Sequence, residues 1–300
     1  MAVTKNLFPD VVQKDIVNLT RGKSSLAKLS DATPIDFVGT DVFTFSFDNR
    51  ASIVGENEAK GVGGITIAPV QIKPFKVEYG ARVSDEFLIA SEKRRVETLK
   101  GFKEGFAKEL GFTLDTAAMH GINPRSGNAS KTVIGNNHFD YIIANYNSGA
   151  NVITYNSSDP NANMEAAISK VMDAEYEVTG AAFAPSFRSA LASQTKSNGD
   201  LMFPELAWGN NADVLRGLLV DSNPSVSFAS SKDKALVGNF RDFFKWGIAR
   251  DIWFDVIQYG DPDNTGVDLA GHNQIYLRCE AYIGYGILAP AAFALVEEGE

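Results

Sequence analysis

The order of apolar and polar residues predicts one long helix as the dominant element of the chain. Between Val83 and Gly121, apolar residues recur mostly at steps of three and four, which places them on one face of a helix. They are Phe87, Leu88, Val96, Leu99, Phe102, Phe106, Leu110 and Leu114. Ser84 is placed to cap the first turn, and Gly121 followed by Pro124 marks the end. Such a helix would be roughly 50 Å long, so it must lie across a molecule.

Two strictly alternating segments before this helix predict a β-hairpin. Phe43, Phe45 and Phe47 alternate with polar residues in FTFSF, and Ile65 and Ile67 continue the pattern in ITIAPVQI. These five residues share one face of the hairpin. Two strands alone are marginally stable in water, so this face needs another surface to lie on. The alternative is that both strands belong to an ordinary larger sheet.

The rest of the chain is predicted to alternate helices with short strands and then to return in strands. Asn163 is placed to cap a helix whose apolar stripe reaches Met172, and Pro185 opens a second helix after the strand AAFAP. This alternation suggests a compact α/β subdomain. The later segment NQIYLRCEAYIGY alternates again, and we expect Cys279 on its buried face.

Composition indicates a globular protein without a membrane-spanning segment. The chain has 300 residues, of which 44% are hydrophobic, so it can bury a sizeable core. The segment 286–296 is too short to span a bilayer, and the first residues lack the apolar centre of a secretory signal, so we expect a cytoplasmic origin and no membrane partner. The single cysteine excludes an intramolecular disulfide.

The distribution of charge suggests one possible functional feature, a local basic patch. The net charge of −9 argues against tight nucleic-acid binding by the whole surface, although it leaves room for local basic patches. Lys93, Arg94 and Arg95 form such a patch near the start of the long helix. It is either a solvated helix face balanced by neighbouring glutamates or a face that meets another subunit's acids or packaged nucleic acid.

The search for catalytic chemistry finds no convincing motif. RGKSS at 21–25 resembles the end of a phosphate loop but lacks the upstream glycine and strand. His120, His138 and His272 lie far apart in sequence, with no metal-ligand spacing. DPDNTG at 261–266 begins like a calcium loop, but Pro262 interrupts it and position twelve is His272. We therefore expect no catalytic, cofactor-binding or metal-binding residue.

Several stretches resemble the major capsid proteins of tailed bacteriophages, which have the Hong Kong 97-type shell fold. They are LSDATPIDFVG before the hairpin, IVGENEAK at its tip, KPFKVEYGARVSDEFL entering the helix, HGINPRSG beyond it, AAFAPSFRSALASQTKSNGDLMFPEL, GIARDIWFDVIQYG and HNQIYLRCEAYIGYGILAPAAFALVEE. The similarity extends from about Leu29 to the end of the chain.

This resemblance implies an α+β fold with a defined order of parts. They are an N-terminal arm over 1–33, an extended hairpin loop over 34–73, the first part of a peripheral domain with its spine helix over 74–150, an inserted axial domain over 151–250, and return strands over 251–300. No long charged helical region precedes the arm, so a fused scaffold domain is not expected. Some relatives join Lys to Asn between subunits; Lys60 lies near the loop tip, but no partner is identified.

The function that the resemblance implies is that of a shell subunit rather than an enzyme. Identical copies are expected to form hexamers and pentamers of an icosahedral head, to use a separate scaffolding protein and a portal, and to enclose double-stranded DNA with non-specific contacts. The expected intersubunit contacts are Phe43, Phe45, Phe47, Ile65, Ile67, Lys93, Arg94 and Arg95. The protein would be made in the cytoplasm of a bacterial host and become part of the virion. The alternatives are an encapsulin-like compartment that holds cargo protein and a soluble α/β enzyme.

Overall fold

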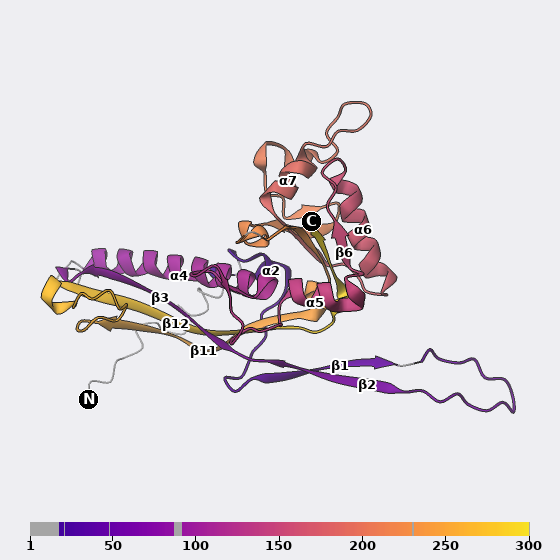
Figure 1. Ribbon diagram of the computed structural model, residues 1–300, viewed down its shortest axis with the longest axis horizontal. Helices are drawn as coiled ribbons and strands as arrows, with labels where there is room; N and C mark the ends of the chain where they lie inside the picture. The colour runs from indigo at the N-terminus through magenta and orange to yellow at the C-terminus, as the bar shows by residue number, and fades with distance from the viewer. Residues whose placement is uncertain (1–17, 21, 48, 87–91, 230, 300) are drawn as a thin grey trace.

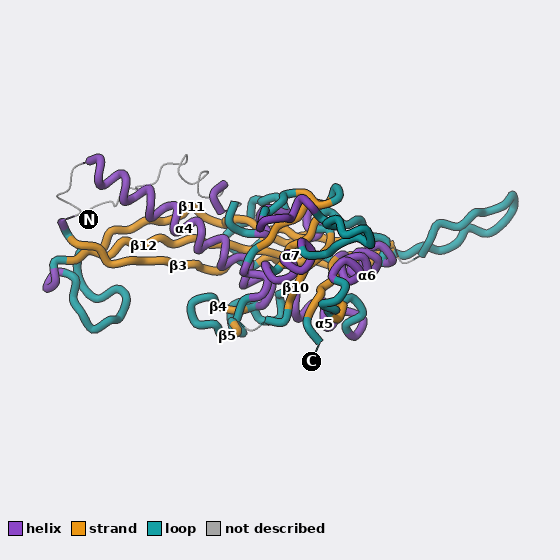
Figure 2. Tube along the Cα trace, turned by 90° about the horizontal axis from the view of Figure 1, so that it is seen from above, coloured by secondary structure: helices purple, strands orange, loops and turns teal. Residues whose placement is uncertain are grey.

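The chain forms an elongated molecule with three distinct parts (Figure 1). A long helix lies along a three-stranded sheet (Figure 2), and a lobe built on a six-stranded sheet stands beside one end of that helix. A two-stranded hairpin projects beneath the lobe in Figure 1. This computed structural model describes residues 18–20, 22–47, 49–86, 92–229 and 231–299.

The described elements are both helical and extended, in agreement with the expected α+β class. The α-helices are α2 (Ser25–Leu29), α4 (Glu92–His120), α5 (Phe139–Asn145), α6 (Pro160–Asp173), α7 (Pro185–Ala192) and α8 (Phe240–Phe243). The strands are β1 (Thr40–Phe47), β2 (Ile65–Ile72), β3 (Phe75–Ser84), β4 (Ile122–Asn123), β5 (Asn128–Ala129), β6 (Val152–Thr154), β7 (Gly180–Phe183), β8 (Val214–Leu215), β9 (Leu218–Ser222), β10 (Asp233–Gly238), β11 (Phe244–Ile257), β12 (Gln274–Ile287) and β13 (Phe293–Glu297). Short 3₁₀ helices are η1 (Tyr146–Ser148), η2 (Pro204–Gly209), η3 (Pro224–Ser227), η4 (Ala270–His272) and η5 (Pro290–Ala292). In the described part of the chain, none of the helices combines the length and apolar character needed to cross a membrane.

The long helix predicted from sequence includes α4, and Glu86, near its predicted start, is also helical. Ser84 is the last residue of β3, and its hydroxyl accepts a hydrogen bond from the Glu86 backbone N–H at 3.3 Å. β3 pairs with β12 up to Ser84, so Ser84 ends the strand and also makes the contact to the Glu86 N–H that the predicted cap requires. Phe87 and Leu88 lie outside the described residues.

The C-terminal half of α4 carries the predicted apolar stripe. Phe106, Leu110 and Leu114 are fully buried, and the half-buried Phe102 ring lies 5.8 Å from that of Phe254 on β11. The helix ends at Gly121 as predicted, in the left-handed region with φ +66°. A side chain at Gly121 would also collide with the His138 ring, since its Cβ would lie 2.5 Å from it. This end of α4 is therefore tightly constrained.

The three-stranded sheet under α4 is antiparallel, in the order β11-β12-β3. One face of β12 is buried as the alternation predicts, and it consists of Ile275, Leu277, Cys279, Ala281 and Ile283. Burial raises the pKa of the Cys279 thiol to about 12. The predicted placement of this cysteine in the core is confirmed.

The lobe is built on a mixed sheet in the order β6-β13-β10-β7-β9-β8. The predicted strand AAFAP is β7, and the predicted helix after it is α7. The predicted cap of α6 is wrong, because Asp159 accepts from the Ala162 backbone N–H at 3.0 Å and Pro160 follows it in the first turn. Asn163 lies inside the helix instead. Met172, expected on the buried stripe, is exposed.

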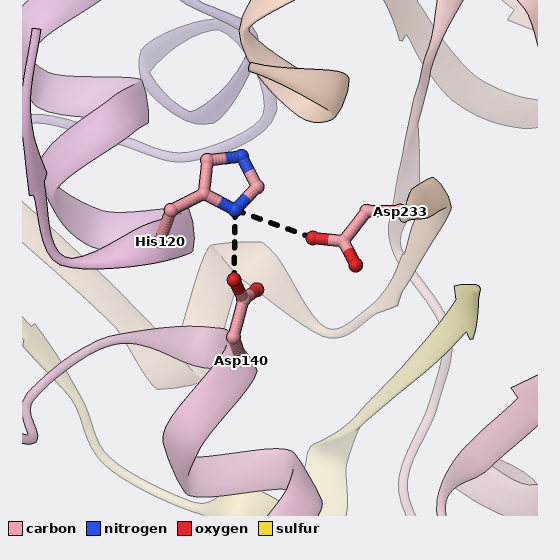
Figure 3. A group of neighbouring side chains, drawn as sticks. All are labelled: His120, Asp140 and Asp233. Atoms are coloured by element: carbon pink, nitrogen blue, oxygen red, sulfur yellow. Dashed lines mark hydrogen bonds and ion pairs between the residues drawn. The ribbon is translucent and has the colours of Figure 1, made fainter. Parts of the chain in front are cut away.

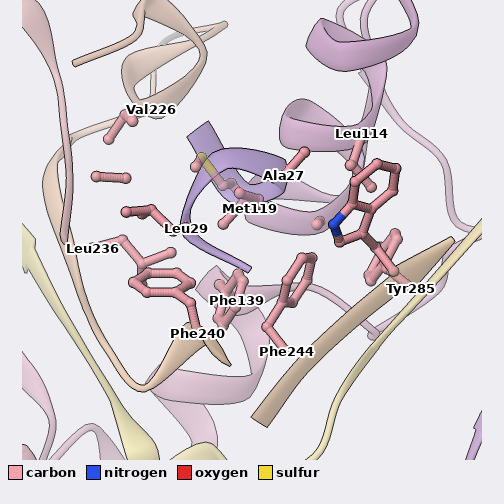
Figure 4. Packing of buried hydrophobic residues seen from close by; sticks show 14 of the residues in the cluster. Ala27, Leu29, Leu114, Met119, Phe139, Val226, Leu236, Phe240, Phe244 and Tyr285 are labelled. Atoms are coloured by element: carbon pink, nitrogen blue, oxygen red, sulfur yellow. The ribbon is translucent and has the colours of Figure 1, made fainter. Parts of the chain in front are cut away.

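The hydrophobic core lies where the lobe meets α4, and α2 is at its centre (Figure 4). Leu26 and Leu29 of α2 are buried there together with Phe139, whose ring centroid lies 4.8 Å from that of Phe293 and 5.6 Å from that of Phe244. The C-terminal part of the expected arm thus packs on its own subunit. Residues 1–17 lie outside the described residues.

Candidate assembly interface

The hairpin β1–β2 presents an uncovered apolar face. The two strands pair in register, with Phe45 opposite Ile67 and Phe43 opposite Pro69, and they form a sheet of their own. The alternative of a larger sheet is therefore wrong. The exposed fractions of Phe43, Phe45, Ile65 and Ile67 are 55%, 68%, 61% and 55%. Phe47 pairs with Ile65, but its side chain lies outside the described part of the structure. A contiguous apolar strip of this kind typically marks an interaction surface.

The base of the hairpin is fixed to the body of the subunit. Ile72, the last residue of β2, is almost fully buried and packs against Gly284 and Gly286 of β12. A Cβ at Gly286 would lie 2.8 Å from the Ile72 side chain, so the close approach requires glycine. The hairpin is anchored at one end, while its apolar face beyond the anchor stays open.

The loop beyond the strands is also exposed. Ile53 and Val62 have no cover in this subunit, and Lys60 is exposed between them. Arg50 forms an exposed ion pair with Glu175, which lies just after α6. An exposed pair contributes only about 0 to 1 kcal/mol, so it orients the loop weakly.

The basic run expected to contact neighbours lies at the start of α4. Lys93, Arg94 and Arg95 belong to the helix, but their side chains lie outside the described residues. The basic residues further along the same helix, Lys100 and Lys108, are exposed. Both interpretations of the run, a solvated helix face and a contact face, therefore remain open.

An exposed tryptophan in the lobe was missed at the sequence level. Trp208 lies in η2 with φ +59°, an unusual conformation for a bulky residue, and its side chain is fully exposed. The Arg188 guanidinium donates to the Gly209 carbonyl oxygen at 2.9 Å and so holds the adjoining backbone. Sequence periodicity gives no signal here, because η2 is a short irregular segment.

A buried polar network joins α2 to α4 and the lobe. The Asp115 carboxylate accepts hydrogen bonds from Ser24 Oγ at 2.5 Å, from the Ser25 and Leu26 backbone N–H groups at 2.9 and 3.1 Å, and from Ser225 Oγ at 2.8 Å. Burial raises the pKa of Asp115 to about 6, although these donors favour its charged form. Ser24 and Ser25 of the RGKSS segment thus bind an internal carboxylate at the start of α2.

A second buried cluster gathers His120, Asp140 and Asp233 at the end of α4 (Figure 3). His120 Nδ1 lies 2.8 Å from an Asp140 oxygen and 3.3 Å from an Asp233 oxygen, and Nε2 lies 2.9 Å from the Ser225 carbonyl oxygen. Burial alone would lower the pKa of His120, but the two carboxylates outweigh it and raise the pKa to about 10. Burial raises the pKa of Asp140 to about 7. No sequence pattern indicates this cluster, because its members lie on three separate elements.

The calcium-like loop 261–266 is organised by an arginine. The Arg82 guanidinium donates to Asp263, to Asp261 at 2.6 Å, to Thr265 Oγ1 at 2.6 Å and to the Val267 carbonyl oxygen at 3.0 Å. The guanidinium takes the central position that a cation would occupy in a metal loop. The loop therefore closes around a positive charge supplied by Arg82 of β3.

Two surface grooves are large enough to admit a small molecule. One, of about 580 Å³, lies between β3, α4 and the β4–β5 segment, and the other, of similar size, lies beside the end of α6. Neither is lined by a histidine or a cysteine.

Comparisons with known proteins agree with a shell subunit. The family model described as the phage capsid family matches residues 4–297. A solved chain of Mycobacterium phage Ogopogo is 31% identical, with a TM-score of 0.75 over 92% of both chains. A chain of Gordonia phage Cozz is 22% identical, with a TM-score of 0.72 over 92% of this chain and 87% of that one. No curated protein sequence matches.

The chain therefore belongs to the phage capsid family, and it is a structural protein of a phage capsid rather than an enzyme. Its fold is the Hong Kong 97-type fold that the sequence motifs suggested. A structure titled "Capsid of empty GTA particle computed with C5 symmetry" shares this fold at 14% identity, with a TM-score of 0.64 over 93% of this chain and 90% of that one. As a member of this family, the chain forms part of a shell of capsid subunits.

Proposed function

We propose that copies of this chain assemble into a closed icosahedral head that encloses the double-stranded DNA of a tailed phage, with each hairpin lying on a neighbouring copy. The observation that carries this proposal is the open apolar face of Phe43, Phe45, Ile65 and Ile67 on a sheet that pairs with nothing else in the described part of the subunit. A neighbouring copy supplies the cover that a single chain lacks.

The parts of the chain take distinct roles in this proposal. The hairpin loop over 34–73 reaches neighbouring copies, whereas α2, in the arm over 1–33, packs in the core of its own subunit. The segment 74–150, with α4, forms the peripheral domain, 151–250 forms the axial domain at the centre of hexamers and pentamers, and 251–300 returns through both. The exposed Trp208 lies in the proposed axial domain and adds a candidate contact between copies. A separate scaffolding protein and a portal complete the assembly.

The packaged DNA is contacted without sequence preference. The net charge of −9 disfavours broad binding to a polyanion, so the contacts are limited to local basic groups, with Lys93, Arg94 and Arg95 as the candidates. Assembly takes place in the cytoplasm of the bacterial host, and the finished shell is part of the virion.

Electron microscopy of the purified full-length protein tests the proposal directly. The wild type is expected to form closed particles, whereas Phe45→Asp is expected to remain a soluble, folded subunit that forms none. Thr44→Asp is the matched control, since Thr44 is the neighbouring position on the same strand and points to the opposite face. Loss of particles in both variants, or in neither, would show that the apolar face is not the contact.

The contents of native particles separate a phage head from a cargo compartment. Particles purified from phage-producing cells are expected to protect double-stranded DNA from added nuclease. Particles that hold one protein species and no DNA would instead support the encapsulin-like alternative.

A further inference from the structure

The cluster at the end of α4 brings three potential metal ligands together from three elements. His120 is the last residue of α4, Asp140 lies in the first turn of α5, and Asp233 opens β10. One ligand atom of each residue lies within 4.8 Å of the others. Figure 3 shows the imidazole and both carboxylates pointing toward one another. Imidazole and carboxylate together are the ligand types that suit Zn²⁺ and related transition metals.

The imidazole is held in the orientation that a metal ligand requires. His120 is buried, and its Nε2 lies 2.9 Å from the Ser225 carbonyl oxygen, so Nδ1 faces the two carboxylates. Ser225 is itself fixed, because its backbone N–H donates to Asn223 and its hydroxyl donates to Asp115. A backbone carbonyl that accepts from the second ring nitrogen is the usual outer contact of a metal-binding histidine. This orientation is therefore set without any help from an ion.

One carboxylate oxygen in the cluster has no partner. Asp140 Oδ1 is buried from solvent and makes no hydrogen bond, and in Figure 3 it is directed toward the side of Asp233. Among the described ion pairs, no lysine or arginine neutralises Asp140 or Asp233. A buried acceptor without a partner is unfavourable, and the positive charge beside the two carboxylates comes from the His120 imidazolium, whose Nδ1 proton a metal ion would replace.

The geometry points to a divalent transition-metal site, and we propose that His120 Nδ1, Asp140 and Asp233 bind Zn²⁺. In a tetrahedral site, ligand atoms at about 2.0 to 2.1 Å from the metal lie roughly 3.3 Å from each other. The distance of 3.3 Å from Nδ1 to Asp233 meets this value, and the 2.8 Å to Asp140 would need to open by about 0.5 Å. Ca²⁺ and Mg²⁺ fit less well, because they prefer oxygen ligands alone.

The fourth ligand is a water molecule reached from the Asp140 side. The Asp140 side chain is 32% exposed, whereas those of His120 and Asp233 are 1% and 5% exposed. The ion enters by this route and connects α4, α5 and β10 at the place where the long helix meets the lobe. This binding does not depend on assembly, so its test is separate from that of the proposed shell.

Selective ¹⁵N labelling of histidine gives a direct test on the full-length protein. The chain has three histidines, and the His138→Gln and His272→Gln variants assign the remaining signals to His120. After removal of bound metal with a chelator, addition of Zn²⁺ is expected to shift the Nδ1 resonance of His120 and to saturate at one ion per chain. A shift confined to the exposed His272, or no shift, would overturn the proposal.

Calorimetric titration with Zn²⁺ then tests whether the Asp140 carboxylate is a ligand. Asp140→Asn keeps the size of the side chain and removes a charged ligand, so we expect affinity to fall at least about tenfold. The matched control is Asp242→Asn, which removes a first-turn carboxylate from α8 without touching the cluster. Equal affinity in wild type and Asp140→Asn would overturn the proposal. If Asp140→Asn does not fold, the wild-type histidine spectrum still decides it.

Discussion

The hairpin β1–β2 and the sheet β11-β12-β3 have the same kind of alternating sequence, but their apolar faces differ in exposure. Both are antiparallel and both alternate apolar with polar residues. The apolar residues of β12 are buried beneath α4, whereas Phe45 and Ile67 of the hairpin face solvent. Alternation thus defines a face but does not say which molecule covers it. The subunit covers one face itself and leaves the other to a partner.

The largest expected effect on the free energy of unfolding comes from a substitution in the buried core of the subunit. Phe139→Ala removes a fully buried ring that packs against Phe240, Phe244 and Phe293. We expect a loss of about 3 to 5 kcal/mol, because the cavity cannot be refilled by a single neighbour. Chemical denaturation of the isolated subunit measures it. A loss below about 1 kcal/mol would mean that this core is loosely packed.

The second effect concerns how the free energy of unfolding of the subunit depends on pH. The pKa of Asp115 is raised from 3.8 to about 6, so the folded state holds its proton more tightly than the unfolded state. The resulting stabilisation is fully present below pH 3.8 and is lost as pH rises through about 6. Relative to Asp115→Asn, the wild type should lose roughly 3 kcal/mol between those limits.

Denaturation curves of wild type and Asp115→Asn at matched pH values measure this difference. Other carboxylates titrate in both proteins and cancel in the comparison. A difference that grows in favour of the wild type as pH rises would show that the four hydrogen bonds to Asp115 outweigh its burial.

A much smaller effect on folding is expected in the hairpin. The double variant Phe45→Ala, Ile67→Ala removes exposed apolar surface, so the free energy of unfolding of the subunit should change by less than about 0.5 kcal/mol for each position. Assembly should nevertheless weaken, as sedimentation of the products would show. If the double variant lost as much folding stability as assembly, the hairpin would contribute to the stability of its own subunit in the same way as the buried core.

The smallest effect on folding is expected at the basic run of α4. Replacing Arg94 and Arg95 together with Gln should leave the folding of the subunit nearly unchanged, since each exposed ion pair contributes about 0 to 1 kcal/mol. Because the same small contact is lost in every subunit of the shell, the double variant should still assemble less well, most clearly at raised ionic strength. Unchanged particle yield across a salt series would identify the run as a solvated helix face.

Local signals predicted much of this fold. The alternation of β1 and β2, the stripe of α4, the start of α7 and the buried face of β12 all follow from periodicity and turn residues close in sequence. Where two local signals competed, the wrong one was chosen: Asp159 followed by Pro160 was the better cap of α6 than Asn163.

Long-range contacts could not be predicted in the same way. Asp115 meets Ser24 across 91 positions and Ser225 across 110, so no window of sequence contains the network. Asp233 and His120 are likewise far apart in sequence, on β10 and α4, and come together only in the folded chain. The apolar face of the hairpin was predictable as a surface, because its alternation is local. Its exposure became visible only once the rest of the subunit was in place.

The loop around Arg82 behaves as a site that carries its own counter-ion. A dissolved calcium ion binds according to its concentration, whereas a guanidinium attached to the neighbouring strand is always present at the same high effective concentration. Dilution and chelators remove a bound calcium ion but leave the guanidinium in place. We therefore expect residues 261–267 to keep the same fold in a calcium-rich medium and in a calcium-poor one.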